Sequence, residues 1–288
     1  MFRALADICK VAEQENKSFW EVIMENDCKD RQLAKEDSFA QMQAMYQAMK
    51  DADAGYDASL VSASGLVGKD GARLQNYVES GKAICGSFMG KVMEKAVKMG
   101  ESNACMKRIV AAPTAGACGV VPAVLISMQE QYGFSDEKMT EAMYVAAGIG
   151  GVIASRAFIA GAAGGCQAEI GSASSMAAGG AAYLMGGDST AITHAAAIAM
   201  KNLLGLVCDP VAGLVEVPCV KRNVSGAMVA LSAADLALAG VESRIVPDEV
   251  IDAMREVGVQ MPACVRETGE GGLAATPSGV KAKEKVFG

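Results

Sequence analysis

The chain has 288 residues, of which 51% are hydrophobic and 5% aromatic, and its formal net charge is −7 at pH 7. A chain of this length can bury a substantial core, while its acidic balance, without clustered basic residues, argues against a nucleic-acid partner. Nine cysteines are too few for a disulfide scaffold, and the start is charged and amphipathic, unlike a signal peptide. We therefore expect a protein of the reducing cytoplasm.

The pattern of residues 1–50 predicts amphipathic helices. Two stretches fit a capping box, in which a hydroxyl and an acid or amide three residues later bind the free backbone N–H groups of a helix start. They run from Ser18 to Glu21 and from Ser38 to Gln41. Four glycines follow in residues 51–71, which we expect to form a loop.

Helical spacing of apolar residues returns at positions 88–99, and Gly100 is expected to end that helix. The next helix is predicted at positions 120–132, with Gly133 beyond it. Ser135 is the expected N-cap of an alanine-rich helix that continues to position 155.

The C-terminal part predicts little besides helix. Pro247 is expected to open a helix, and "GLVEVP" (213–218) is the best strand candidate, although it is too isolated to form a sheet. From Met261 the chain is glycine-rich and is expected to be irregular. The sequence thus predicts an all-α protein, one Gly/Ala-rich domain over residues 1–288 with an irregular C-terminal tail.

Two weakly charged regions raise the question of a membrane span. Residues 142–208 carry four charges and residues 109–129 carry none, but glycine pairs, Pro113 and Pro122 interrupt them. No Leu/Ile/Phe-rich segment of about twenty residues is present, so we expect a buried helical core and no membrane partner. The many glycines suit either close helix packing or close approach of the backbone to a ligand.

The nine cysteines differ in their surroundings. Four lie in amphipathic helical stretches, where cysteine behaves as a small buried hydrophobe: Cys9, Cys28, Cys85 and Cys105. Cys166, Cys208 and Cys219 follow glycine or lie near proline, which predicts turns or helix starts, where a lowered pKa favours the metal-binding thiolate. Cys118 and Cys264 are reserve candidates.

The spacing of Cys166, Cys208 and Cys219 matches no zinc finger or ribbon, and the single histidine, His194, lies in an alanine-rich helical stretch where a structural role is expected. Three dispersed thiolates suit an iron–sulfur cluster, and three ligands on a four-iron cube leave one iron open to substrate. The same spacing also suits three ordinary buried cysteines.

Five segments carry a resemblance to a known family. They are "SASGLVGKDG", "AAPTAGACGVVPAVL", "GGCQAEIGSASSMAAGG", "GLVCDPVAGLVEVPCVKRN" and "RETGEGGLAATPSG". In this order they resemble the iron–sulfur-dependent L-serine dehydratases, and most closely the α, or catalytic, subunit of the two-chain form. The resemblance covers nearly the whole chain.

The resemblance implies an all-helical domain with a 4Fe–4S cluster bound by Cys166, Cys208 and Cys219. It also implies that L-serine is converted to pyruvate and ammonia without pyridoxal phosphate, and that a β subunit is the partner. The general base is expected on that partner, because His194 lies outside the recognised motifs. The chain ends Val286-Phe287-Gly288, so we expect no terminal thiolate on the open iron.

The substrate carboxylate is expected to meet hydroxyl, amide, guanidinium and backbone donors near these motifs. The candidates are Ser62, Ser64, Gly65, Thr114, Arg222 and Asn223. The first four also suit a solvated loop or turn, and Arg222 also suits an ion pair with Glu216 or Glu169. Lys69 departs from the family pattern "GLTGGD", where a second glycine is expected.

Three alternative functions stay open on sequence alone. A related iron–sulfur hydro-lyase or a cysteine desulfidase would use the same cluster. A non-catalytic subunit would bind the cluster without turnover. A pyridoxal enzyme is the third, but no Schiff-base lysine motif supports it.

Overall fold

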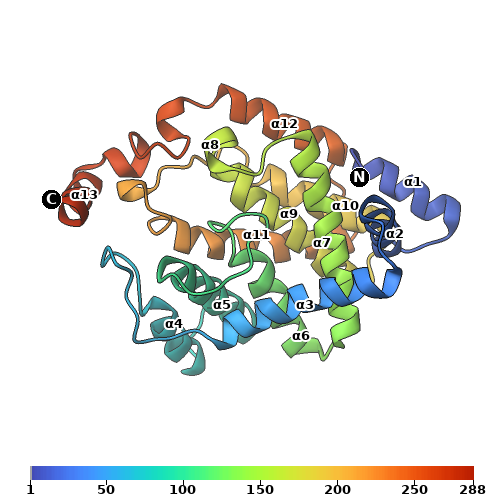
Figure 1. Ribbon diagram of the computed structural model, residues 1–288, viewed down its shortest axis with the longest axis horizontal. Coiled ribbons are helices and arrows are strands. Elements are labelled where there is room, and N and C mark those ends of the chain that lie inside the picture. Colours follow the sequence, from blue (N-terminus) through green and yellow to red (C-terminus); the bar gives the residue numbers. More distant parts are fainter. Residues whose placement is uncertain (1) are drawn as a thin grey trace.

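The computed structural model describes residues 2–288 and is all helical, as predicted (Figure 1). Within those residues there is no β-strand, and no helix is both long and apolar enough to cross a membrane. The first seven helices are α1 (Leu5–Glu15), α2 (Phe19–Arg31), α3 (Lys35–Ala54), α4 (Asp70–Glu79), α5 (Gly86–Ala104), α6 (Val120–Tyr132) and α7 (Asp136–Arg156). The remaining helices are α8 (Gly161–Gly164), α9 (Ser172–Leu184), α10 (Ser189–Lys201), α11 (Cys219–Leu238), α12 (Pro247–Gln260) and α13 (Pro277–Phe287).

Helix α9 lies at the centre of the fold, where it packs against α6, α7, α10 and α11 (Figure 1). All of its residues except Tyr183 are buried. Small residues make this close packing possible: a Cβ on Gly179 would lie 2.1 Å from Ile149 of α7. Glycine serves helix packing here, and one continuous hydrophobic core extends from α1 to α12.

Most helix boundaries follow from local sequence. The capping box at Ser18 and Glu21 is present, the side chain of Ser135 caps α7, and Gly133 ends α6 in the left-handed conformation with φ 71°. Pro247 opens α12 as expected. Each of these signals acts within one helical turn, which is why the sequence could predict it.

Two predicted boundaries are wrong for the same physical reason. Ser38 lies inside α3, 1% exposed, and its hydroxyl donates to Asp27 of α2 at 2.7 Å. Gly100 lies inside α5, where a Cβ would stand 3.1 Å from the Val220 backbone of α11. Both residues serve contacts between helices, which a local sequence pattern does not reveal.

The C-terminal part corrects two further predictions. "GLVEVP" forms no strand but follows a 3₁₀ turn at Val211–Gly213, and the described chain has its one isolated β-bridge between Cys208 and Arg266. The tail is irregular only as far as Thr276, after which α13 forms at the end of the molecule opposite α1 (Figure 1). Thr276 caps α13 through its side chain.

Candidate functional site

Three buried cysteines come together from three segments of the chain. Cys166 directly precedes the π-helical turn η1 (Gln167–Gly171), Cys208 lies in the loop between α10 and α11, and Cys219 is the first residue of α11. Their exposed fractions are 3%, 3% and 8%, and all are free thiols. The predicted positions on turns and helix starts are therefore confirmed.

The pKa values of these thiols differ. Interaction with the neighbouring Cys208 thiol lowers the pKa of Cys166, and interaction with Cys166 raises the pKa of Cys208. The charge of Arg222 further lowers the pKa of Cys166, whereas burial raises the pKa of Cys219 to about 12. The expected lowering thus holds for Cys166 alone: the interaction with Cys166 and then burial raise the pKa of Cys208, and burial disfavours the thiolate of Cys219.

Gln167 holds the segments of the first two cysteines together. Its backbone N–H donates to the Leu206 carbonyl at 3.0 Å, and its side-chain oxygen accepts the Gly205 N–H at 2.9 Å. Its amide nitrogen donates to the Met254 carbonyl at 3.0 Å. Gly165, with φ 77°, is required beside this junction, since a Cβ there would lie 3.0 Å from the Leu206 oxygen.

The C-terminal tail fixes the backbone of Cys208. The Cys208 N–H donates to the Val265 carbonyl at 2.8 Å, and the Glu267 N–H donates to the Cys208 carbonyl at 2.7 Å. The next residue, Asp209, accepts the Leu273 N–H at 2.8 Å. The tail is therefore part of the site.

Two carboxylates lie beside the Cys208 thiol. Glu169 accepts a hydrogen bond from the Thr114 hydroxyl at 2.7 Å through Oε1, and its Oε2 lies 3.9 Å from Cys208 Sγ. A Cβ on Gly161 would stand 2.9 Å from Glu169 Oε2 and 3.2 Å from Glu267 Oε2. Burial raises the pKa of Glu169, and the charge of Glu267 raises it further.

Neither carboxylate is among the site residues that the sequence predicts. A signal existed for Glu169, because it is the only charged residue between Arg156 and Asp188 and follows Cys166 by one helical turn. Glu267 belongs to the recognised segment "RETGEGG", but its approach to Cys208 depends on the pairing of the tail, which the sequence does not show.

Arg222 binds the loop that contains Cys208. Its guanidinium donates to the Val207 carbonyl at 2.8 Å and forms an ion pair with Asp209 at 2.7 Å. The side chains of Arg222 and Asp209 are 14% and 3% exposed. The expected ion-pair partners were Glu216 or Glu169, so the structure replaces both with Asp209.

Asn223 ties α11 to the turn that contains Thr114. Its amide oxygen accepts the Gly119 N–H at 2.8 Å, and its amide nitrogen donates to the carbonyls of Gly116 at 2.9 Å and Cys219 at 3.0 Å. Asn223 is 1% exposed, and both polar atoms of its amide are hydrogen-bonded to these backbone groups. Contact with a substrate stays a prediction.

Glu216 gathers the hydroxyls of the "SASG" loop. The Ser62 hydroxyl donates to Glu216 Oε2 at 2.9 Å, and the Ser64 hydroxyl donates to the same oxygen. The Gly65 N–H donates to the Ser62 carbonyl at 2.9 Å. An internal carboxylate therefore occupies the two hydroxyls that we expect to bind a substrate carboxylate.

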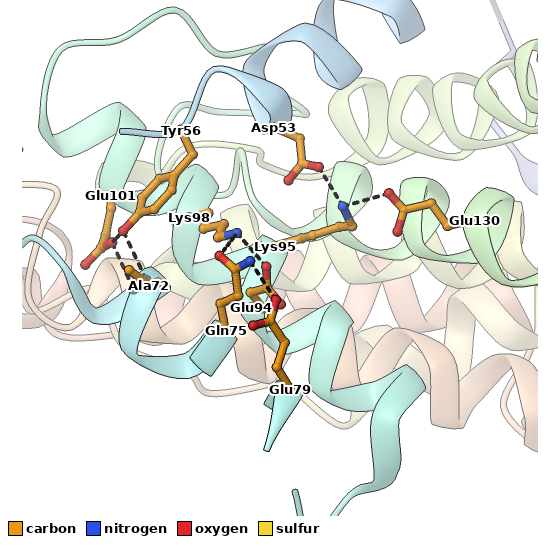
Figure 2. A network of polar contacts seen from close by, with 11 residues as sticks. Asp53, Tyr56, Ala72, Gln75, Glu79, Glu94, Lys95, Lys98, Glu101 and Glu130 are labelled. Carbon is orange, nitrogen blue, oxygen red and sulfur yellow. Dashed lines mark hydrogen bonds and ion pairs between the residues drawn. The ribbon is translucent and has the colours of Figure 1, made fainter. Parts of the chain in front are cut away.

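A polar network holds the flanks of this loop. Figure 2 shows Tyr56 at Glu101, and the Glu101 carboxylate also accepts the N–H groups of Asp70 at 2.8 Å and Gly71 at 3.0 Å. A carboxylate at the start of α4 suits the positive end of the helix dipole. Lys69 precedes it with φ 71°, a left-handed conformation that explains why glycine is expected there.

The other candidates have surroundings of their own. His194 on α10 accepts the Ser243 N–H at 2.8 Å through Nδ1, which is a structural contact. Cys118 is buried, with its thiol 3.7 Å from the Met99 carbonyl, and Cys264 is exposed. Cys85 is also exposed, and Cys9, Cys28 and Cys105 are only half-buried, which corrects the expectation that these four cysteines are buried.

Across residues 2–288, no three His, Cys, Asp or Glu side chains are placed to hold a single metal ion. A four-iron cluster is larger than one ion, and each thiolate binds a different iron, so its ligands lie farther apart than those of a single metal ion.

The fold and the site together define a class: an all-helical protein whose site combines buried thiols with carboxylates and hydroxyls. The family model described as "Serine dehydratase alpha chain" matches residues 14–274. The chain belongs to this family.

Several relatives are similar over the full chain. The "Probable L-serine dehydratase, alpha chain" of Bacillus subtilis (strain 168) is 46% identical over 288 residues, covering 100% of this chain and 96% of that protein. The "L-serine dehydratase, alpha chain" of Peptoniphilus asaccharolyticus is 42% identical over 282 residues, 98% of this chain and 97% of that protein. The "L-serine dehydratase TdcG" of Escherichia coli (strain K12) is 45% identical over 181 residues, 62% of this chain and 40% of that protein.

Proposed function

We propose that this chain is the catalytic subunit of an iron–sulfur-dependent L-serine dehydratase of the cytoplasm, which forms pyruvate and ammonia without pyridoxal phosphate. The observation that carries the proposal is that Cys166, Cys208 and Cys219 are buried free thiols that interact with one another. Full-length relatives named L-serine dehydratase alpha chain support the reaction.

The donor set fits a 4Fe–4S cluster with three protein ligands. Thiolates from Cys166, Cys208 and Cys219 are the ligands that such clusters use. The charge of Arg222 acts on Cys166 and offsets part of the negative charge of the thiolates. When bound, the cluster supplies an open iron that acts as a Lewis acid on the carboxylate and β-hydroxyl of serine.

The residues of this chain then bind and orient the substrate. Ser62 and Ser64 already hold a carboxylate, that of Glu216, so a substrate carboxylate that replaces Glu216 Oε2 keeps both hydroxyls hydrogen-bonded. The Gly65 N–H supports the turn that presents them, and Thr114 positions Glu169 beside Cys208.

The general base comes from a β subunit in this proposal. A base must lie within hydrogen-bond reach of the α-proton, and His194 instead uses Nδ1 to accept the Ser243 N–H, away from the cysteines. The partner base removes the α-proton and passes a proton to the β-hydroxyl, which leaves as water. The resulting aminoacrylate tautomerises and hydrolyses to pyruvate and ammonia.

The first test is the content of iron and acid-labile sulfide after purification without oxygen. The wild-type chain should contain about four of each, Cys208→Ala should lose most of both, and the exposed Cys264→Ala should match the wild type. Sulfide-free wild type, or a cluster indifferent to Cys208, would show that the assignment is wrong.

The second test adds the partner chain and compares substrates. Release of pyruvate from L-serine supports the dehydratase, whereas turnover of L-cysteine alone would indicate a desulfidase. A cluster that forms but whose spectrum ignores L-serine would indicate a non-catalytic subunit.

A further inference from the structure

We propose that Glu169 and Glu267 bind the α-ammonium group of the substrate and thereby select amino acids over hydroxy acids. The inference rests on the proposed function and adds substrate recognition to it. It concerns two side chains of the candidate site that are not among the three cysteines proposed to bind the cluster.

Both carboxylates converge on one point beside Cys208. A Cβ on Gly161 would stand 2.8 Å from Cys208 Sγ, 2.9 Å from Glu169 Oε2 and 3.2 Å from Glu267 Oε2. Only a residue without a side chain allows these three polar atoms to approach the same stretch of backbone. The two acidic oxygens, from distant parts of the sequence, are thereby brought within reach of one small cation.

The backbone holds Glu267 in this place. Its φ is 66°, which is uncommon for a residue with a side chain and persists only where the surroundings impose it. The surroundings are the backbone of Cys208, whose carbonyl accepts the Glu267 N–H and whose N–H donates to Val265. The position of the Glu267 carboxylate is therefore tied to that of the cysteine.

The charges of the site call for a cation. Within residues 2–288, neither Glu169 nor Glu267 forms an ion pair, and the Glu267 side chain accepts no hydrogen bond. The nearby Arg222 is committed to Asp209 and to the Val207 carbonyl. Two partly buried carboxylates that approach the same stretch of backbone repel one another unless a positive group lies between them.

An α-ammonium group matches this arrangement. It carries one positive charge and several N–H donors, whereas carboxylates are pure acceptors. A hydroxyl in its place has no charge and a single donor, so it leaves one carboxylate without a partner. Sites built for a charged donor reject the analogue that lacks it. The pair therefore predicts discrimination between 2-amino and 2-hydroxy acids.

L-Alanine and L-lactate provide a non-reacting test, because they differ at the α-substituent and lack the β-hydroxyl. Calorimetry on the cluster-loaded complex with the partner chain should show tighter binding of alanine. Glu267→Gln should weaken alanine binding by about ten- to a hundredfold and leave lactate binding unchanged or stronger. Glu169→Gln should act in the same direction, and the exposed Glu270→Gln is the matched control.

Iron content measured on the same samples separates the possible failures. A full cluster with equal binding of alanine and lactate, or no binding of either, overturns this inference alone. Loss of both affinities by the same factor in the Glu variants overturns it as well, since it indicates a general structural effect. A wild-type complex without cluster overturns the proposed function instead.

Discussion

Replacement of Arg222 by methionine should destabilise the protein even without any cofactor. The guanidinium lies 2.7 Å from Asp209, and the two side chains are 14% and 3% exposed. Methionine fills much of the same space but leaves the Asp209 carboxylate buried, with the Leu273 N–H at 2.8 Å as its remaining hydrogen-bond donor among the described residues. An uncompensated buried charge is among the most destabilising changes that one substitution can make.

The expected magnitude follows from burial. Removing one partner of a buried ion pair costs about 3–5 kcal/mol, a large part of the roughly 5–15 kcal/mol that stabilises a typical protein. The matched control is Arg73→Met, because Arg73 pairs with Asp70 at 2.7 Å but the two side chains are 74% and 37% exposed. Its cost should stay below about 1 kcal/mol.

Urea unfolding of the apoprotein under reducing conditions measures both free energies. The double variant Arg222→Met, Asp209→Asn should recover part of the loss, since no buried charge then remains. Equal costs for Arg222→Met and Arg73→Met would refute the reasoning. So would a double variant whose loss equals the sum of the two single losses.

Three other outcomes are expected. His194→Gln should leave turnover with the partner chain nearly intact; a loss of several decades would move the base to this chain. Lys69→Gly should raise the free energy of unfolding by about 1 kcal/mol, because φ 71° suits glycine; a lower urea midpoint would contradict this. Ser18→Ala should cost about 1 kcal/mol at neutral pH. Its hydroxyl lowers the pKa of Glu21, so part of that cost should disappear as acid protonates Glu21; a cost independent of pH would exclude the link.

Local chemistry made most of the fold predictable. Ser135 and Gly133 satisfy or release backbone groups within one helical turn, and the structure places both as expected. The boundaries predicted at Ser38 and Gly100 are wrong because each residue contacts another helix. Ser38 binds Asp27, and Gly100 allows the backbone of α11 to approach closely. Serine or glycine can mark the end of a helix or a contact with a neighbouring helix, and the local sequence does not distinguish the two.

The cysteines of the site were predictable from the sequence, but the partners of its polar side chains were not. Turn-forming glycine and proline set Cys166, Cys208 and Cys219 apart from the other cysteines, and the structure buries all three. The partners of the hydroxyls and of Arg222 were not predictable, because Glu216 and Asp209 reach them through loops whose course depends on the tertiary fold.

The three cysteines also differ in how their backbone is fixed, and this difference explains why the C-terminal tail pairs with Cys208. Cys219 belongs to α11 and Cys166 leads into a π-helical turn, so the hydrogen bonds of a helix fix each of them. Cys208 has no helix of its own, and both its N–H and its carbonyl bond to the C-terminal tail. A loop residue whose backbone groups are buried must find such partners, or it loses the free energy of their hydration. The tail therefore supplies for Cys208 what helices supply for the other two, and the same pairing brings the Glu267 carboxylate to the thiol.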